Sequence, residues 1–132
     1  MVDDKTPIRR AMQKLLGAKH EVVLAASGRE ARALLEADRS FDVVLCDLMM
    51  PEVNGMELHA WLSTLDPALA RRTIFVTGSA SASKEKEYLA ATGAKVITKP
   101  VDAAELLEAV TRQVARSRER PPPPAGPGEA AP

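Results

Sequence analysis

The sequence has few cysteines and no long apolar run, and both shortages narrow the classes of protein to which it can belong. Its single cysteine, Cys46, has no partner for an internal disulfide and forms no CxxC motif, which argues against a disulfide scaffold. No apolar run approaches the length of a membrane span, and the first ten residues lack the apolar stretch of a secretory signal. The expected location is the cytoplasm, without membrane contact by this domain.

The sequence also lacks an excess of charge of either sign. Lys and Arg together number 18, Asp and Glu together number 18, and the formal net charge is zero. No overall field therefore attracts nucleic acid or an anionic membrane, and direct nucleic-acid binding is not expected. The length of 132 residues, with 45% apolar and 27% charged residues, fits one globular domain with a core of its own.

Short apolar runs alternate with segments of helical spacing along most of the chain. The apolar runs cover residues 22–25, 43–46, 73–76 and 96–98. This alternation predicts an α/β fold with a parallel sheet and helices on both faces. The helices are expected over 7–16, from 27 onward, over 56–65, over about 83–91, and from 102 to about 118.

Cap residues set the expected helix ends. Thr6 is expected to cap the first helix and Gly17 to stop it, while Ser27 with Glu30 reads as a capping box for the second. After about residue 118 the chain becomes rich in proline and glycine. We therefore expect one domain over residues 1–118 and a disordered tail over 119–132.

Polar residues follow the expected strands at the points where the strands end. Asp3 and Asp4 follow Met1-Val2, Asp47 follows the run ending at Cys46, Thr77 follows Val76, and Lys99 follows Thr98. In an open parallel sheet the carboxyl ends of the strands meet at one edge, where functional groups collect. Three carboxylates, one hydroxyl and one ammonium are thus expected to converge.

Three converging carboxylates repel each other unless a cation neutralises them. Carboxylate oxygens, a backbone carbonyl and waters suit Mg²⁺, which also accepts phosphate as a ligand. A carboxylate beside such an ion can attack phosphorus and form an acyl phosphate. The resulting charge can be shared by the cation, by Lys99 and by the hydroxyl of Thr77.

With these motifs the chain resembles a response-regulator receiver domain, the phosphoacceptor module of two-component signalling. The resemblance runs from residue 1 to about 118 and rests on "VDD", "LCDLMMPEVNG", "FVTGS" and "TKP". It implies a doubly wound five-stranded parallel sheet of the flavodoxin-like order. It also implies transfer of a phosphoryl group from a sensor histidine kinase or a histidine phosphotransfer domain, with the chain acting as a signalling switch rather than as an enzyme.

The resemblance implies a role for each residue at the strand ends. Asp47 matches the phosphoacceptor, and Asp3 and Asp4 match the acidic pair that binds Mg²⁺, with Asp4 the direct ligand. Met49 matches the position whose backbone carbonyl reaches the metal. Thr77 matches the switch hydroxyl and Lys99 the partner of the phosphoryl charge. Pro51 and Gly55 match residues that turn the following loop away from the site, and the Lys99-Pro100 bond resembles the family's cis peptide.

Two positions depart from the family pattern. Only Met1 and Val2 precede the acidic pair, so the first strand is expected to be truncated. A start inside a longer protein, a start assigned too late, and a neighbouring chain that completes the sheet are all open explanations. Val96 stands where the family often has Tyr or Phe, so a large aromatic switch on that face is not expected.

Several alternatives stay open from the sequence. The chain could be the C-terminal receiver of a hybrid sensor kinase or a stand-alone receiver, and a homodimer is open as well. A docking module that works without phosphate would keep the same fold. A phosphohydrolase of the haloacid dehalogenase type would also use an aspartate nucleophile, but that family has a second acid where Met49 stands here.

Overall fold

The computed structural model describes residues 1–119 apart from Met49, Pro51 and 79–82, and it confirms the alternation of strands and helices. The tail beyond residue 119, Met49 and Pro51 lie outside the described residues. The described helices are α1 (Thr6–Leu16), α2 (Gly28–Ala37), α3 (Gly55–Leu65), α4 (Pro67–Ala70), α5 (Ser83–Thr92) and α6 (Ala103–Glu119). None of these helices combines the length and the apolar character needed to cross a membrane.

The sheet is parallel and is built around three strands in the order β1 (Val44–Asp47), β2 (Thr73–Thr77) and β3 (Lys95–Thr98). Asp47 pairs with Val76 across β1 and β2, and Thr77 pairs with Thr98 across β2 and β3. Single bridges continue the sheet beyond β1, because Val2 pairs in parallel with both Cys46 and Ala25. The full spatial order is therefore the segment at Ala25, the segment at Val2, and then β1, β2 and β3.

This arrangement confirms the doubly wound α/β class and the truncated first strand, but it corrects the expected extent of the strand over 22–25. The run 22–25 was expected to be a strand, whereas only Ala25 pairs, and Val2 pairs alone as well. A strand forms only where a neighbour pairs with it, and Met1 and Val2 offer just two positions beside this run. The sheet of the described residues therefore has three strands and two bridged segments, of which the short segment at Val2 was expected and the short segment at Ala25 was not.

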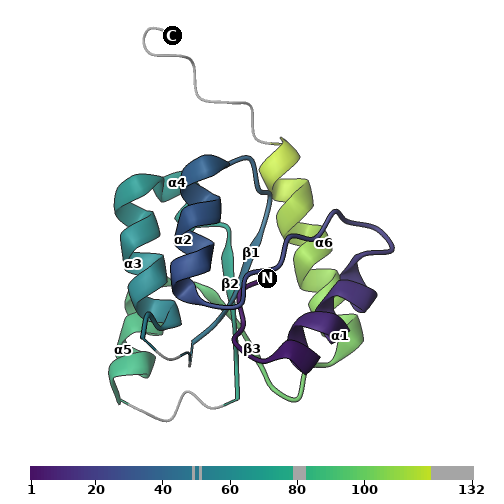
Figure 1. Cartoon of the computed structure of the whole chain (residues 1–132), viewed down its shortest axis with the longest axis horizontal. Coiled ribbons are helices and arrows are strands. Elements are labelled where there is room, and N and C mark those ends of the chain that lie inside the picture. Colours follow the sequence, from purple (N-terminus) through teal and green to yellow (C-terminus); the bar gives the residue numbers. More distant parts are fainter. Residues whose placement is uncertain (49, 51, 79–82, 120–132) are drawn as a thin grey trace, which may run out of the picture.

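Helices cover both faces of the sheet (Figure 1). On one face, α1 and α6 pack against side chains from alternate strand positions, including Leu45, Ile74 and Ile97. On the other face, α2 and α3 pack on Cys46 and Phe75. Successive strand residues point to opposite faces, so the fully apolar strands that the sequence shows are those of a sheet buried on both sides.

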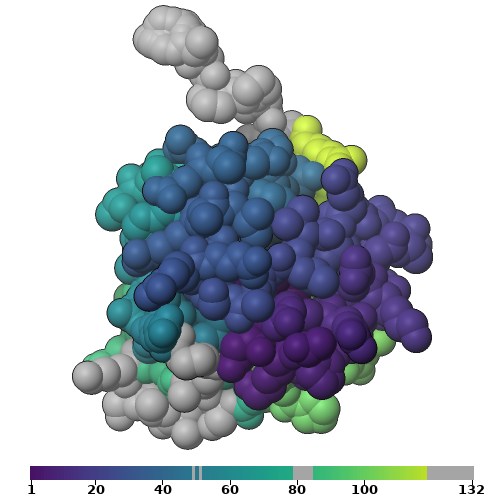
Figure 2. Space-filling model, viewed as in Figure 1, coloured from purple at the N-terminus to yellow at the C-terminus, as the bar shows by residue number. Residues whose placement is uncertain are grey.

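The N-terminal part of the chain forms much of the molecular surface seen in the space-filling view. The residues of α1, in purple, and the segment up to α2, in blue, cover most of this face of the molecule (Figure 2). Met12 and Leu16 of α1 are buried beneath that surface. The first 37 residues thus contribute both the acidic pair and a large share of the cover over the sheet.

Most helix ends lie within two residues of their predicted positions, but three details were wrong. Lys5, not Thr6, is the N-cap of α1, and it makes no side-chain cap. Ser27 accepts a hydrogen bond from the Glu30 amide as predicted, but the Glu30 carboxylate accepts from the Ala26 amide, so the capping box is incomplete. The short helix α4 was not expected, because no helix is predicted directly after residue 65. Asp66 in fact caps α4, with Pro67 in its first turn.

A groove opens beside the first residue of the chain. It has a volume of about 460 Å³, and its walls include Val23, Leu35, Val43 and Val114. The Met1 ammonium lies in this groove and donates to the Val23 carbonyl at 2.9 Å. We call this feature the N-terminal groove.

Candidate functional site

Asp47 ends the central strand of the whole arrangement and is held by the backbone on both of its flanks. The strand β1 is buried along its length, and Asp47 itself is 1% exposed. Its amide donates to the Val2 carbonyl at 2.9 Å, and its strand pairs with β2 on the other side. The position of this carboxylate at the sheet edge is therefore fixed by the ladder and not by a mobile loop.

The loop that follows Asp47 returns close to it at Gly55. The Gly55 amide donates to the Leu48 carbonyl at 3.0 Å. A Cβ at position 55 would lie 2.4 Å from the Asp47 carbonyl oxygen, which is shorter than any normal contact. Only glycine permits this approach, and α3 begins at Gly55 itself with Asn54 as its cap.

The acidic pair lies next to Asp47 although it stands on a very short paired segment. The Asp3 amide donates to the Ala25 carbonyl at 3.1 Å, which completes the pairing around Val2. The Asp3 carboxylate accepts from the Lys5 amide at 2.9 Å, and the Arg9 guanidinium donates to the Asp3 carbonyl at 2.8 Å. Local contacts with the start of α1 thus hold the pair where a long strand is absent.

The structure brings together three carboxylates and one ammonium. Oxygens of Asp3, Asp4 and Asp47 all lie within 4.8 Å of one another. The Lys99 ammonium lies 3.3 Å from Oδ2 of Asp3 and 3.5 Å from Oδ2 of Asp47. Asp3 is fully buried, and the Lys99 side chain is 19% exposed. The Asp4 side chain is 28% exposed and lies 3.5 Å from the Lys5 ammonium. The cluster is thus open to solvent on the side of Asp4.

The charges of this cluster do not balance. Three carboxylates face the Lys99 ammonium, and the exposed Lys5 ammonium pairs with Asp4 at the solvent side, so an excess of negative charge remains in the cluster, and buried like charges repel strongly. A divalent cation would balance this excess, and clustered carboxylate oxygens are the donors that hard cations such as Mg²⁺ prefer. The donor set therefore fits a hard divalent cation held by Asp3, Asp4 and Asp47.

Cys46 precedes Asp47 but points into the core. It is 1% exposed and packs with Val2 and Phe75. Burial, and secondly the negative charge of Asp47, raise the pKa of the Cys46 thiol to about 12. The thiol therefore stays protonated at neutral pH and is neither a nucleophile nor a metal ligand.

Thr77 and Lys99 stand at the carboxyl ends of the next two strands. Thr77 is the last residue of β2 and is 1% exposed. The Lys99 amide donates to the Thr77 carbonyl at 2.7 Å, and the Lys99-Pro100 bond is cis, as expected. The backbone thus places Thr77 beside Lys99, while its role as a switch stays a prediction, and Met49 lies outside the described residues.

The sequence reading missed the part that α1 has in the site. Arg9 binds the backbone of Asp3 and also donates to the Thr6 hydroxyl at 3.0 Å. A basic residue one turn into a helix that starts just after an acidic pair is a signal that could have indicated this contact.

Comparison with known proteins points to a single family. The model of the response regulator receiver domain matches residues 1–111. A transcriptional regulatory protein, ZraR of Salmonella typhimurium, is 32% identical over 120 residues, which are 90% of this chain and 26% of that protein. The chain thus spans about a quarter of the length of this relative.

Solved structures agree with this assignment. A CheY-like response regulator receiver domain protein from Methanospirillum hungatei matches with a TM-score of 0.80 and 29% identity, over 89% of this chain and 93% of that one. The signal receiver domain of a signal transduction histidine kinase from Syntrophus aciditrophicus matches with a TM-score of 0.78 and 26% identity, over 91% of each chain.

Proposed function

The chain belongs to the response regulator receiver domain family, and we propose that Asp47 is the residue that accepts the phosphoryl group. One observation carries this proposal: Asp47 is fixed at the sheet edge with two further carboxylates within 4.8 Å and an ammonium 3.5 Å from its Oδ2. A buried acidic cluster with one cation at this edge is typical of phosphoryl transfer onto a side chain.

Asp3, Asp4 and Asp47 would hold Mg²⁺, together with the backbone carbonyl of Met49 that the family pattern implies. When bound, the ion neutralises the excess negative charge and offers a ligand position to a phosphoryl oxygen. The three carboxylates are the part of this set that the structure places within reach of each other.

The proposed reaction moves one phosphoryl group from a phosphohistidine to Asp47. A carboxylate oxygen of Asp47 attacks phosphorus and forms a P–O bond. The P–N bond of the donor breaks, its electron pair goes to the imidazole nitrogen, and that nitrogen takes up a proton. Lys99, which lies between Asp3 and Asp47, stabilises the charge of the transferred group.

Thr77 is the proposed sensor of the new group. Its hydroxyl would donate a hydrogen bond to a phosphoryl oxygen. Val96 is half-buried beside the core and has no aromatic ring to swing inward. The output is therefore not expected to depend on a rotamer change at position 96.

We propose a sensor histidine kinase or a histidine phosphotransfer domain as the partner, with the cytoplasm as the place of reaction. The similarity to the receiver of a histidine kinase is compatible with a C-terminal receiver of a hybrid kinase. The similarity to ZraR, a transcriptional regulatory protein about four times as long as the matched segment, is equally compatible with a receiver joined to an output domain.

The test is phosphorylation of the purified chain with acetyl phosphate and Mg²⁺, read by intact-protein mass spectrometry. The expected result is a mass gain of one phosphoryl group that is lost in Asp47→Asn. Asp38→Asn is a matched control, because Asp38 is an exposed aspartate whose carboxylate accepts hydrogen bonds from Ser40 at the end of α2, outside the acidic cluster. A docking module would show no gain, and a phosphohydrolase would turn over acetyl phosphate many times per chain; either result with folded protein contradicts the proposal.

A further inference from the structure

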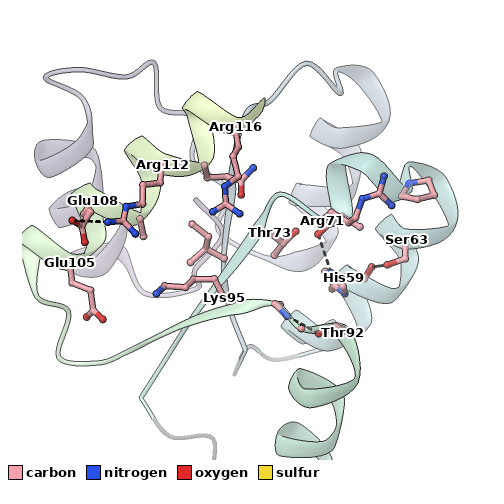
Figure 3. A pocket seen from close by; sticks show the side chains of 17 residues that line it. His59, Ser63, Arg71, Thr73, Thr92, Lys95, Glu105, Glu108, Arg112 and Arg116 are labelled. Atoms are coloured by element: carbon pink, nitrogen blue, oxygen red, sulfur yellow. Dashed lines mark hydrogen bonds and ion pairs between the residues drawn. The ribbon is translucent and has the colours of Figure 1, made fainter. Parts of the chain in front are cut away.

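A second polar hollow lies at the opposite edge of the sheet from Asp47. It has a volume of about 640 Å³ and opens where β2 and β3 begin (Figure 3). One wall is formed by α6, and the other by α3 and α4 together with the residues after them. We call it the basic hollow, because of the side chains described next.

Four cations and two carboxylates line the basic hollow, which leaves an excess of two positive charges. The cations are Arg71 after α4, Lys95 at the start of β3, and Arg112 and Arg116 on α6; the carboxylates are Glu105 and Glu108. Lys95 reaches across from β3 toward α6 (Figure 3). The lining thus gathers cations from three separate elements.

Three of these cations are not neutralised by the protein. Arg112 pairs with Glu108 at 3.4 Å. Within the described part of the chain, the side chains of Arg71, Lys95 and Arg116 make no ion pair and no hydrogen bond. Like charges that share one hollow repel, and an anion between them would relieve that repulsion.

A buried hydroxyl group at the hollow gives a second, independent indication that the hollow binds a ligand. Thr73, the first residue of β2, lines the hollow and is 5% exposed. Its hydroxyl is buried and, among the residues that the structure describes, has no hydrogen-bond partner. A buried hydroxyl without a partner costs free energy, so an acceptor atom brought into the hollow would offset that cost.

We propose that the basic hollow binds a small molecule with a doubly charged phosphate group. Such a group matches the excess of two positive charges, and guanidinium groups bind phosphate oxygens in a fork geometry. The volume lies within the range of small-molecule sites and leaves room for a substituent of nucleotide size. Since the ligand would contact α6, β3 and the residue after α4, its binding would stabilise the packing of α6 against the amino end of the sheet.

This site does not depend on phosphorylation. Asp47, Thr77 and Lys99 stand at the carboxyl ends of β1, β2 and β3 or just beyond them, whereas Thr73 and Lys95 begin β2 and β3. The full chain with Asp47→Asn is therefore expected to bind the same ligand with unchanged affinity. A lack of ligand binding would therefore contradict only the proposed hollow site, whereas a lack of phosphorylation would contradict only the proposed function.

The test uses the ¹⁵N-labelled full chain in Mg²⁺-free buffer at constant ionic strength, titrated separately with inorganic phosphate and with adenosine monophosphate. Saturable amide shifts are expected at Thr73, Lys95 and the α6 residues of the hollow. Lys95→Gln and Arg116→Gln, both at exposed positions, should each weaken binding by roughly five- to tenfold. Thr73→Val, which removes the hydroxyl at similar volume, should weaken it as well.

Arg10→Gln is the matched control, because Arg10 is an exposed arginine on α1, outside the hollow. Binding of this variant should equal that of the unmodified chain. Tighter binding of the nucleotide than of phosphate would assign a nucleotide-sized ligand, and equal binding would assign the phosphate group alone. The proposal is overturned if neither probe gives saturable shifts, or if Lys95→Gln, Arg116→Gln and Thr73→Val all keep the original affinity.

Discussion

Replacing Gly55 by alanine is expected to lower the stability of the domain and to slow phosphorylation of Asp47, the proposed phosphoacceptor. An alanine Cβ would lie 2.4 Å from the Asp47 carbonyl oxygen and 2.9 Å from the Leu48 Cα. Both neighbours are backbone atoms, which cannot rotate away as the end of a side chain can. The backbone that carries Asp47 must therefore shift.

The size of the effect follows from two opposing terms. Overpacking of this kind costs about 1–3 kcal/mol, whereas replacing glycine by alanine within a helix gains up to about 1 kcal/mol. Gly55 is the first residue of α3, so the gain there is at the low end. A net loss of about 1–2 kcal/mol is expected, which lowers the melting temperature by roughly 4–12 °C.

Urea unfolding followed by circular dichroism measures the first effect, and the rate of phosphorylation by acetyl phosphate measures the second. A shift of the attacking oxygen by a fraction of an ångström should slow phosphorylation by about tenfold or more. Gly78→Ala is the control for stability, because a Cβ at that position meets nothing within 4 Å. If Gly55→Ala is as stable as the unmodified protein, the close approach between the loop and Asp47 is not a real constraint.

Three further outcomes are expected. Lys99→Met leaves the buried carboxylates of Asp3 and Asp47 without their ammonium, so the melting temperature without metal should fall, and the rise on adding Mg²⁺ should be larger than in the unmodified chain. Burial lowers the pKa of His59 in the folded protein, although its hydrogen bond to the Ala70 carbonyl opposes this shift. The stability that neutral His59 contributes is therefore fully present above pH 6.5 and is lost as the pH falls through the pKa of the folded state. Urea unfolding at several pH values should show a weaker pH dependence of stability in His59→Gln. Burial also lowers the pKa of the Met1 ammonium from 8.0 to about 6, so the folded state is less stable when this group is charged. An apolar extension before Met1 replaces the ammonium with an amide and should therefore stabilise the chain by up to about 2 kcal/mol at pH 6.

Each of these outcomes has a control. Lys86→Met, at an exposed position of α5, should leave the response to Mg²⁺ unchanged. His20→Gln should leave this pH dependence intact, because His20 lines the N-terminal groove and lies apart from His59, which lines the basic hollow. A Gly/Ser extension of equal length removes the same ammonium but offers no apolar side chains. Equal stabilisation by both extensions would show that the charge alone matters and that the N-terminal groove does not take up apolar residues.

The convergence of the site was predictable from sequence because it depends on topology alone. Asp47 and Lys99 lie far apart in the chain, yet parallel strands end at one edge, and the ammonium lies 3.5 Å from the carboxylate. The doubly wound class was predictable for the same reason, since strand and helix alternate. These features require no knowledge of distances within loops.

The features that the sequence did not indicate depend on which neighbour is present. The run 22–25 has the composition of a strand, but pairing requires a partner, and only Ala25 finds one in Val2. The full capping box at Asn54 and Glu57 was not predicted, because Pro51 and Gly55 were interpreted as loop residues. Thr73 looks like an ordinary strand residue in sequence, and its unsatisfied hydroxyl is visible only once the packing around it is known.

The pairing of Val2 couples the proposed metal site to the packing of the sheet. The same segment fills a place in the sheet with Val2 and presents Asp3 and Asp4 at the edge. Linkage is reciprocal, so whatever holds Val2 in the sheet must tighten cation binding, and cation binding must in turn hold Val2 in place. If the proposed magnesium site is correct, the affinity for magnesium would report how stably the first residues are folded. A partner protein that bound or displaced that segment would then change the phosphorylation of Asp47 without contacting Asp47.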